Sequence, residues 1–273
     1  RLTIGVSAGS GTLTARDASG ELRLVNHGTN DLVINSVVAN NVGASGLMKA
    51  GSGRTVLYAV NTYSGTTAVN GGMLELGGGV SVSSGNNLYI AGTTTFKHNS
   101  SATQTMGTIT GAGDIVKDNV SGRLNVYGIG GPNFRGNVYL KAGILDVDWY
   151  GGRGAGVDGL FADLNHGYLV LDGGQLNFGQ DATFSQTFTL GTNGGTLYGY
   201  NANHSWPGTS AINFANPGAR TLTFAASGTY NTPFSFAIGD QNPTTGKTSV
   251  TLTNGAWTLY GANSYSGQTI VQS

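Results

Sequence analysis

An internal repeat places the strongest constraint on what this chain can fold into. Residues 53–71 and 255–273 are identical at nine of 19 aligned positions, and both contain Asn-x-Tyr-Ser-Gly, beginning at Asn61 and at Asn263. A diverged third copy lies between them at 115–147. Internal similarity of this kind marks architectures in which each unit buries its apolar face only against the next unit. The chain is therefore expected to stack repeats rather than enclose one compact core.

Each copy consists of short apolar runs separated by Gly or Asn. The runs alternate with a period of two residues, which indicates β-strands, and no eleven-residue stretch keeps helical spacing without a breaker. One apolar residue followed by Tyr recurs in all three copies and is expected to mark equivalent strand sites, apolar inward and Tyr outward. These pairs are Leu57 with Tyr58, Val126 with Tyr127 and Leu259 with Tyr260. The repeats predict an all-β fold, a parallel β-helix or β-solenoid.

Composition agrees with this prediction and narrows the function. Glycine provides 47 of 273 residues and supplies the sharp turns, while a hydrophobic content of 38% is too high for a disordered glycine-rich tail. Thirteen basic and thirteen acidic residues cancel. We therefore expect no nucleic-acid partner. The longest apolar stretches are about five residues, far short of the roughly 20 that a membrane helix needs, so we also expect no membrane insertion by this chain. The absence of cysteine excludes disulfides and thiolate metal sites.

The repeat resembles the passenger-associated transport repeat, also called the autotransporter-associated β-strand repeat. The family pattern runs Gly-Leu-x-Lys-x-Gly, then Asn-x-Tyr-x-Gly-x-Thr-x-Val, and then Gly-x-Leu. Residues 46–76 match most of it, 115–147 match with Phe134 in place of the Tyr, and 255–271 match to the end. The resemblance implies a right-handed parallel β-helix, secretion to the bacterial cell surface, a stalk or adhesin role, and neither a common catalytic site nor a cofactor.

We expect one β-solenoid domain over 1–273, with repeat copies near 46–77, 115–147 and 249–273. An irregular insertion rich in glycine and aromatic residues is expected over 148–206. The leading hypothesis is an extracellular structural or adhesive surface protein that forms a stalk or filament. The alternative is a polysaccharide-binding or polysaccharide-degrading β-helix protein.

The candidate contact residues lie in and around the insertion. They are Asp146, Asp148, Trp149, Tyr150 and Trp206. The two aspartates alternate on a strand-like segment, so their carboxylates would share one face; they could bind an ion or act as an acid/base pair, or simply face solvent. The aromatic residues could stack on sugar rings or on a protein, or could instead fill the solenoid where its coils widen.

No catalytic set is expected, and no metal site. The four histidines are each flanked by Asn or Gly and are expected at surface turns. They are His27, His98, His166 and His204. No pair of them has ligand spacing, and the aspartates have no basic neighbours along the sequence. We therefore predict that the protein is not an enzyme.

The two ends of the chain suggest continuation. Arg1 is not a start residue and no signal peptide follows it, so the chain is expected to be excised from a longer precursor. The last repeat stops soon after Val271, before the strand that followed in the first copy. An unfinished coil leaves backbone groups unpaired, so we expect either a longer chain or head-to-tail self-association. Surface glycans are a further class of partner that we consider.

Overall fold

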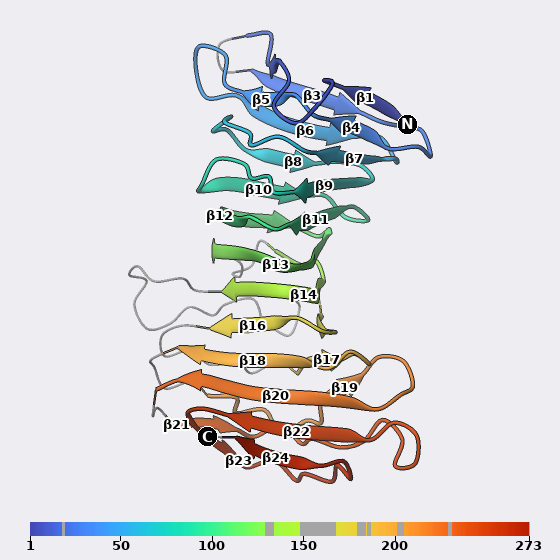
Figure 1. Cartoon of the computed structure of the whole chain (residues 1–273), viewed down its shortest axis with the longest axis vertical. Coiled ribbons are helices and arrows are strands. Elements are labelled where there is room, and N and C mark those ends of the chain that lie inside the picture. The colour runs from blue at the N-terminus through green and yellow to red at the C-terminus, as the bar shows by residue number, and fades with distance from the viewer. Residues whose placement is uncertain are drawn as a thin grey trace.

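The computed structural model describes residues 1–17, 20–128, 134–147, 168–178, 184, 187–200, 205–228 and 231–272. Over these residues the chain is all-β, and it winds as a stack of coils with the N-terminus at one end and the C-terminal strands at the other (Figure 1). All pairings between its strands are parallel. The predicted parallel β-solenoid is confirmed.

The longest ladder of paired strands runs from the N-terminal end deep into the C-terminal half. We call it ladder 1. It joins β1 (Leu2–Ile4), β4 (Leu32–Ile34), β7 (Arg54–Leu57), β9 (Met73–Gly78), β11 (Thr95–Ser100), the first parts of β13 (Asp114–Gly128) and β14 (Val138–Val147), β15 (Leu169–Leu171), β17 (Thr189–Leu190) and β19 (Asn213–Phe214).

Two further ladders form the other sides of the coils. Ladder 2 joins β3 (Glu21–Val25), β6 (Gly46–Ala50), β8 (Thr67–Val69), β10 (Asn86–Ile90) and the end of β12 (Thr103–Gly111). Ladder 3 joins the start of β12, the second parts of β13 and β14, β16 (Gln175–Phe178), β18 (Gly195–Tyr200), β20 (Arg220–Ser227), β22 (Thr248–Thr253) and β24 (Thr269–Gln272). Two pairs stand apart, β2 (Thr12–Thr14) with β5 (Val37–Ala39), and β21 (Asn231–Phe234) with β23 (Ala256–Leu259).

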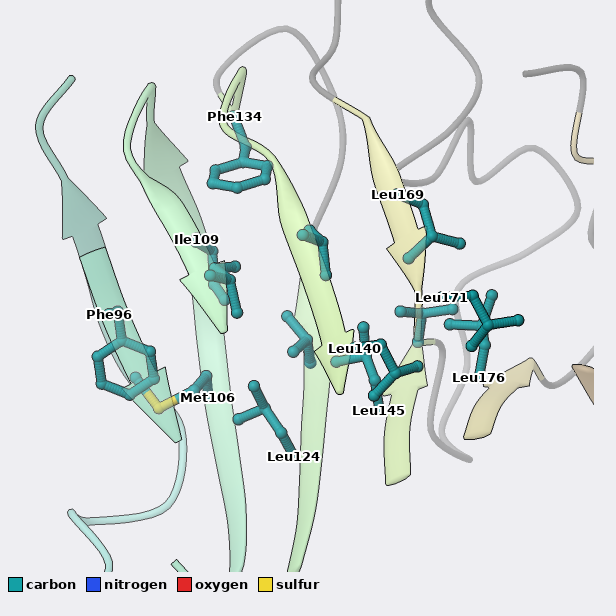
Figure 2. Close-up of a cluster of buried hydrophobic side chains, with 14 of the residues drawn as sticks. Phe96, Met106, Ile109, Leu124, Phe134, Leu140, Leu145, Leu169, Leu171 and Leu176 are labelled. Carbon is teal, nitrogen blue, oxygen red and sulfur yellow. The ribbon is translucent and has the colours of Figure 1, made fainter. Parts of the chain in front are cut away.

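Because the strands are parallel and in register, inward side chains from successive coils stack in columns. The inward column of ladder 1 passes through Ile34, Leu57, Leu76, His98, Lys117, Leu140, Leu171, Leu190 and Phe214. Figure 2 shows buried side chains of the central coils stacked in this way. The continuous apolar interior is what holds the coils together.

The repeat copies are offset from one another around the solenoid. Leu57 lies on ladder 1, Val126 lies on ladder 3, and Leu259 pairs with Phe234 in the separate β21–β23 pair. The expectation that these positions are equivalent strand sites is therefore wrong in its spatial sense. The coils between the copies do not add up to whole turns, so each copy starts on a different side.

The expected direction of these side chains is confirmed where they are described. Leu57 and Val126 are buried, and Leu259 packs partly buried against the core. Tyr260 is 65% exposed and Tyr58 is half-buried, whereas the side chain of Tyr127 lies outside the described residues. Among the described residues no helix could span a membrane.

Candidate functional site

The Asn and Tyr side chains of the Asn-x-Tyr-Ser-Gly motif form hydrogen bonds within the solenoid. Asn61 Oδ1 accepts a hydrogen bond from the backbone N–H of Val38 at 2.9 Å, which joins one coil to the previous one. The Tyr63 side chain is fully buried, and its hydroxyl lies 2.7 Å from Thr67 Oγ1. Thr67 is four residues further along, so this bond closes the corner that ends the coil. The motif thus fixes the turn and the register together.

The last copy repeats these bonds with its own residues. Asn263 Oδ1 accepts from the backbone N–H of Ile238 at 2.9 Å, and the Tyr265 hydroxyl lies 2.8 Å from Thr269 Oγ1. The two copies therefore share a structure as well as a sequence. In the first copy Asn61, Tyr63 and Thr67 are buried, whereas Asn263 and Thr269 of the last copy are exposed.

The lysine of the repeat has a similar internal role. Lys49 is fully buried, and its Nζ donates to the backbone oxygens of Ala50, Gly51 and Gly71 at 2.7–2.8 Å. Gly51 has a φ of +78°, and a side chain there would collide with the backbone of the preceding coil. The ammonium group thus donates to several carbonyl oxygens around this turn. The positive φ at Gly51 is a conformation that glycine adopts without strain. Burial lowers the pKa of Lys49 to about 8.

Lys117 occupies the corresponding position in the middle copy. Its Nζ donates to the backbone oxygen of Asn119 at 2.7 Å and to that of Ala142 at 3.2 Å. Desolvation by burial lowers its pKa to about 8 as well. Lys117 therefore bonds to turn carbonyls in the same way as Lys49.

Asp146 is the predicted contact residue around which a polar cluster forms. It lies on β14, between the inward residues Leu145 and Val147, and its side chain is 1% exposed. Asp146 Oδ2 accepts from Arg123 Nη1 at 2.6 Å and from Asn177 Nδ2 at 3.3 Å. The expectation that Asp146 simply faces solvent is wrong, because the neighbouring coils supply partners that cover it.

Tyr200 extends this cluster across several coils. Its hydroxyl lies 3.3 Å from Arg123 Nη1 and 3.2 Å from Asn177 Nδ2, although Tyr200 belongs to β18 and Arg123 to β13. The ring of Tyr198 is 5.0 Å from that of Tyr200, edge to face. Tyr198, Tyr200 and Arg123 are therefore partly accessible on the outward face of ladder 3. The buried polar groups of Asp146 and Asn177 lie beneath them.

The pKa of Asp146 depends both on its burial and on its two partners. Burial raises the pKa of Asp146, while the hydrogen bond from Asn177 and the charge of Arg123 oppose that rise. Asp146 Oδ1 has no hydrogen-bond partner. Within the described ranges no group of three or more His, Asp or Glu side chains is placed to bind a metal ion.

The other predicted contact residues do not join this cluster. Asp148, Trp149 and Tyr150 lie outside the described residues. Trp206 is 1% exposed and stacks on Phe184, with ring centroids 4.2 Å apart. Of the two alternatives for Trp206, packing in the core is the correct one, and it is not a surface contact residue.

The histidine prediction fails at one position. His27 is exposed in the loop after β3, but His98 is fully buried in the middle of β11, on the inward column of ladder 1. The Asn that follows His98 suggested a turn, whereas the residue belongs to a continuous strand. His166 and His204 lie outside the described residues.

Sequence reasoning missed Arg123 and Asn177, and it placed Tyr200 only among the aromatic residues of the expected insertion. They are far from Asp146 along the chain and become neighbours because coils stack in register. Asn125, Asp146 and Asn177 are direct ladder partners. A search for polar residues separated by one coil length would have found part of the cluster, since 23 residues separate Arg123 from Asp146.

The passenger-associated transport repeat family matches residues 47–76 and 254–273, the first and last of the three copies. The chain thus carries passenger-associated transport repeats at these two places, as its sequence predicted. It is 28% identical over 299 residues to the adhesin BmaC autotransporter of Brucella suis biovar 1 (strain 1330). That alignment covers 96% of this chain and 8% of the relative, so the chain spans a small part of that protein's length. No solved structure matches this chain.

Proposed function

We propose that this passenger domain is a non-enzymatic, extracellular scaffold of an adhesin at the bacterial cell surface. The single observation that carries the proposal is the inward use of the repeat residues. Asn61, Tyr63 and Lys49 all bond within the solenoid, and the last copy repeats the Asn and Tyr bonds. Residues that define the family therefore build the rod, and its outward face is left to carry contacts.

We further propose that the outward face of ladder 3 around Tyr198, Tyr200 and Arg123 is the contact surface. Partly exposed aromatic rings stack on the apolar faces of sugars, and a guanidinium donates several hydrogen bonds in one plane. The Asp146 carboxylate and the Asn177 amide beneath them hold Arg123 and Tyr200 in place. This chemistry favours a glycan as the class of ligand, in line with the polysaccharide-binding alternative.

The adhesin proposal is tested by measuring binding of the purified passenger domain to a glycan array and to immobilised host-matrix proteins. We expect binding without release of shortened glycan. Absence of binding on both surfaces would contradict an adhesive role for this segment. Glycan shortening that disappears in Asp146→Ala would contradict the non-enzymatic role.

The location of the contact surface is tested by two matched tyrosine variants. Tyr198→Ala is expected to reduce binding at least tenfold, because it removes a half-buried ring that is partly accessible on this face. Tyr260→Ala removes a ring that is 65% exposed elsewhere and is expected to leave binding unchanged. Equal binding by both variants would move the contact surface away from ladder 3 while leaving the adhesin proposal standing.

A further inference from the structure

The interior column of ladder 1 is apolar except at two successive coils. His98 and Lys117 are direct ladder partners there, between Leu76 on one side and Leu140 on the other. Ladder partners stand about 4.8 Å apart, so the imidazole lies beside the ammonium-bearing side chain. Both residues are fully buried. No acidic side chain is the ladder partner of either.

The two buried residues differ in how their polar atoms are satisfied. Lys117 donates to the backbone oxygens of Asn119 and Ala142, as described above. His98 has no hydrogen-bond partner at either Nδ1 or Nε2. Burying a neutral imidazole without a hydrogen-bond partner costs free energy. An imidazolium would cost more, because it would place a second positive charge beside Lys117.

The charged groups on the surrounding strands provide no carboxylate that could pair with a protonated His98. Glu75, on β9, is the outward neighbour of Leu76 and pairs with Arg54 at 3.0 Å. Lys97, on the outward side of β11, pairs with Asp118 of β13 at 2.7 Å. These carboxylates are engaged on the outer face. They are not placed to compensate a proton on the inward-facing ring of His98.

The first repeat copy provides an internal comparison. The ladder partner that precedes Lys49 is Leu24, whereas the partner that precedes Lys117 is His98. The buried lysine is therefore a shared feature of the two copies, and the titratable neighbour is specific to the middle copy. Replacing His98 by Leu reproduces the arrangement of the first copy.

We propose that His98, stacked on Lys117 in the core, makes the central coils of this passenger domain a breakpoint that opens on mild acidification. In the folded chain His98 stays neutral, and once β11 separates from β13 the imidazole is hydrated and takes up a proton. Acid therefore favours the open form of these coils over the closed one. The device goes beyond the adhesin role, since it regulates the integrity of the rod and not its contact surface.

The direction of the pH effect follows from the two states. Desolvation, followed by repulsion from Lys117, lowers the pKa of His98 from 6.5 to about 3 in the folded chain. Stability is therefore fully present above pH 6.5 and is lost as the pH falls toward 3. Between pH 6.5 and pH 5 most carboxylates remain ionised, so this window isolates the histidine.

The experiment is hydrogen exchange, followed by mass spectrometry of peptides, on the wild-type chain at pH 7.5 and pH 5.0 with correction for intrinsic exchange rates. Peptides covering 95–117 are expected to open about tenfold more often for each pH unit below 6.5. Peptides covering 54–76, in coils without a buried histidine, are expected to change much less. An equal change in both regions, or none in 95–117, overturns the proposal.

Two variants separate the histidine from the rest of the core. His98→Leu is expected to remove the excess opening at pH 5.0, whereas Lys49→Met, in the first copy, is expected to leave it. If His98→Leu does not fold, the wild-type ring is titrated by NMR instead. A His98 midpoint below pH 5 supports the proposal, and one near 6.5 overturns it, because the ring would then gain its proton without opening.

Discussion

The two halves of the solenoid fill the same kind of interior in different ways. From β3 to β14 the core consists chiefly of Leu, Ile and Val, and its buried aromatic side chains among the described residues are Tyr63, Phe96 and Phe134. From β15 onward the described core gathers seven large aromatic side chains. They are Phe178, Phe184, Phe188, Trp206, Phe224, Phe234 and Phe236.

The number of residues per coil differs between the two regions in the same direction. On ladder 3, Gln104, Leu124 and Leu145 are successive partners about one short coil apart. Further on, Leu197 pairs with Phe224 and Phe224 with Leu252, so more residues separate the partners. A wider coil encloses more space, and a close-packed interior then requires larger side chains. Parallel pairing therefore sets the distance between successive strands. It does not set the number of residues in each coil, which depends on the connecting segments.

The largest expected effect is the loss of Trp206 from the aromatic half. Its ring packs against Phe178, Phe184, Phe188, Phe234 and Phe236. Trp206→Ala is expected to lower the free energy of unfolding by about 3–5 kcal/mol, because the surrounding rings cannot collapse into the cavity. Urea unfolding followed by circular dichroism measures this.

Two further variants sharpen the Trp206 result. Trp206→Phe keeps most of the volume, and the indole nitrogen has no hydrogen-bond partner to lose, so its cost is expected to be much smaller. Tyr260→Ala, on the exposed side, is expected to be nearly neutral. A Trp206→Ala protein as stable as the wild type would show that aromatic packing does not hold the C-terminal half together.

A smaller effect is expected for the buried lysine of the aliphatic half. Lys49→Met keeps the apolar stem but leaves three backbone oxygens without their donor, which is expected to cost about 2 kcal/mol. Lys117→Met removes two such bonds and is expected to cost less. Unfolding of both variants in urea tests this order. A Lys49→Met protein more stable than the wild type would mean that the free-energy cost of desolvating the ammonium group exceeds the stabilisation from its three hydrogen bonds.

The smallest effect compares one hydrogen bond in two places. Tyr63→Phe removes a fully buried bond to Thr67 and is expected to lower the free energy of unfolding by about 1 kcal/mol. Tyr265→Phe removes the same bond to Thr269 where water can replace it, so its effect is expected to be smaller. The melting temperatures of the two variants measure the difference. Equal decreases in melting temperature would contradict the view that the Tyr–Thr hydrogen bond stabilises the first copy more because it is buried.

Much of the fold could be predicted because its determinants are local. The bond between Tyr63 and Thr67 spans four residues, and the tight turn at Gly51 depends on one backbone conformation. Such features recur wherever the motif recurs, so the repeat alone predicted a parallel solenoid with short strands. The inward direction of Leu57 and Val126 followed from alternation for the same reason.

The neighbours of each side chain were decided only by the tertiary structure. Coil lengths accumulate along the chain, so a few extra residues in one connection turn every later copy to another side of the rod. That is why Leu57 shares its column with Lys117 and not with Val126. The same accumulation brings Arg123 to Asp146 and His98 to Lys117, pairs that no short motif encodes. The sequence by itself determined how each coil turns, and the stacking of coils determined which charges meet.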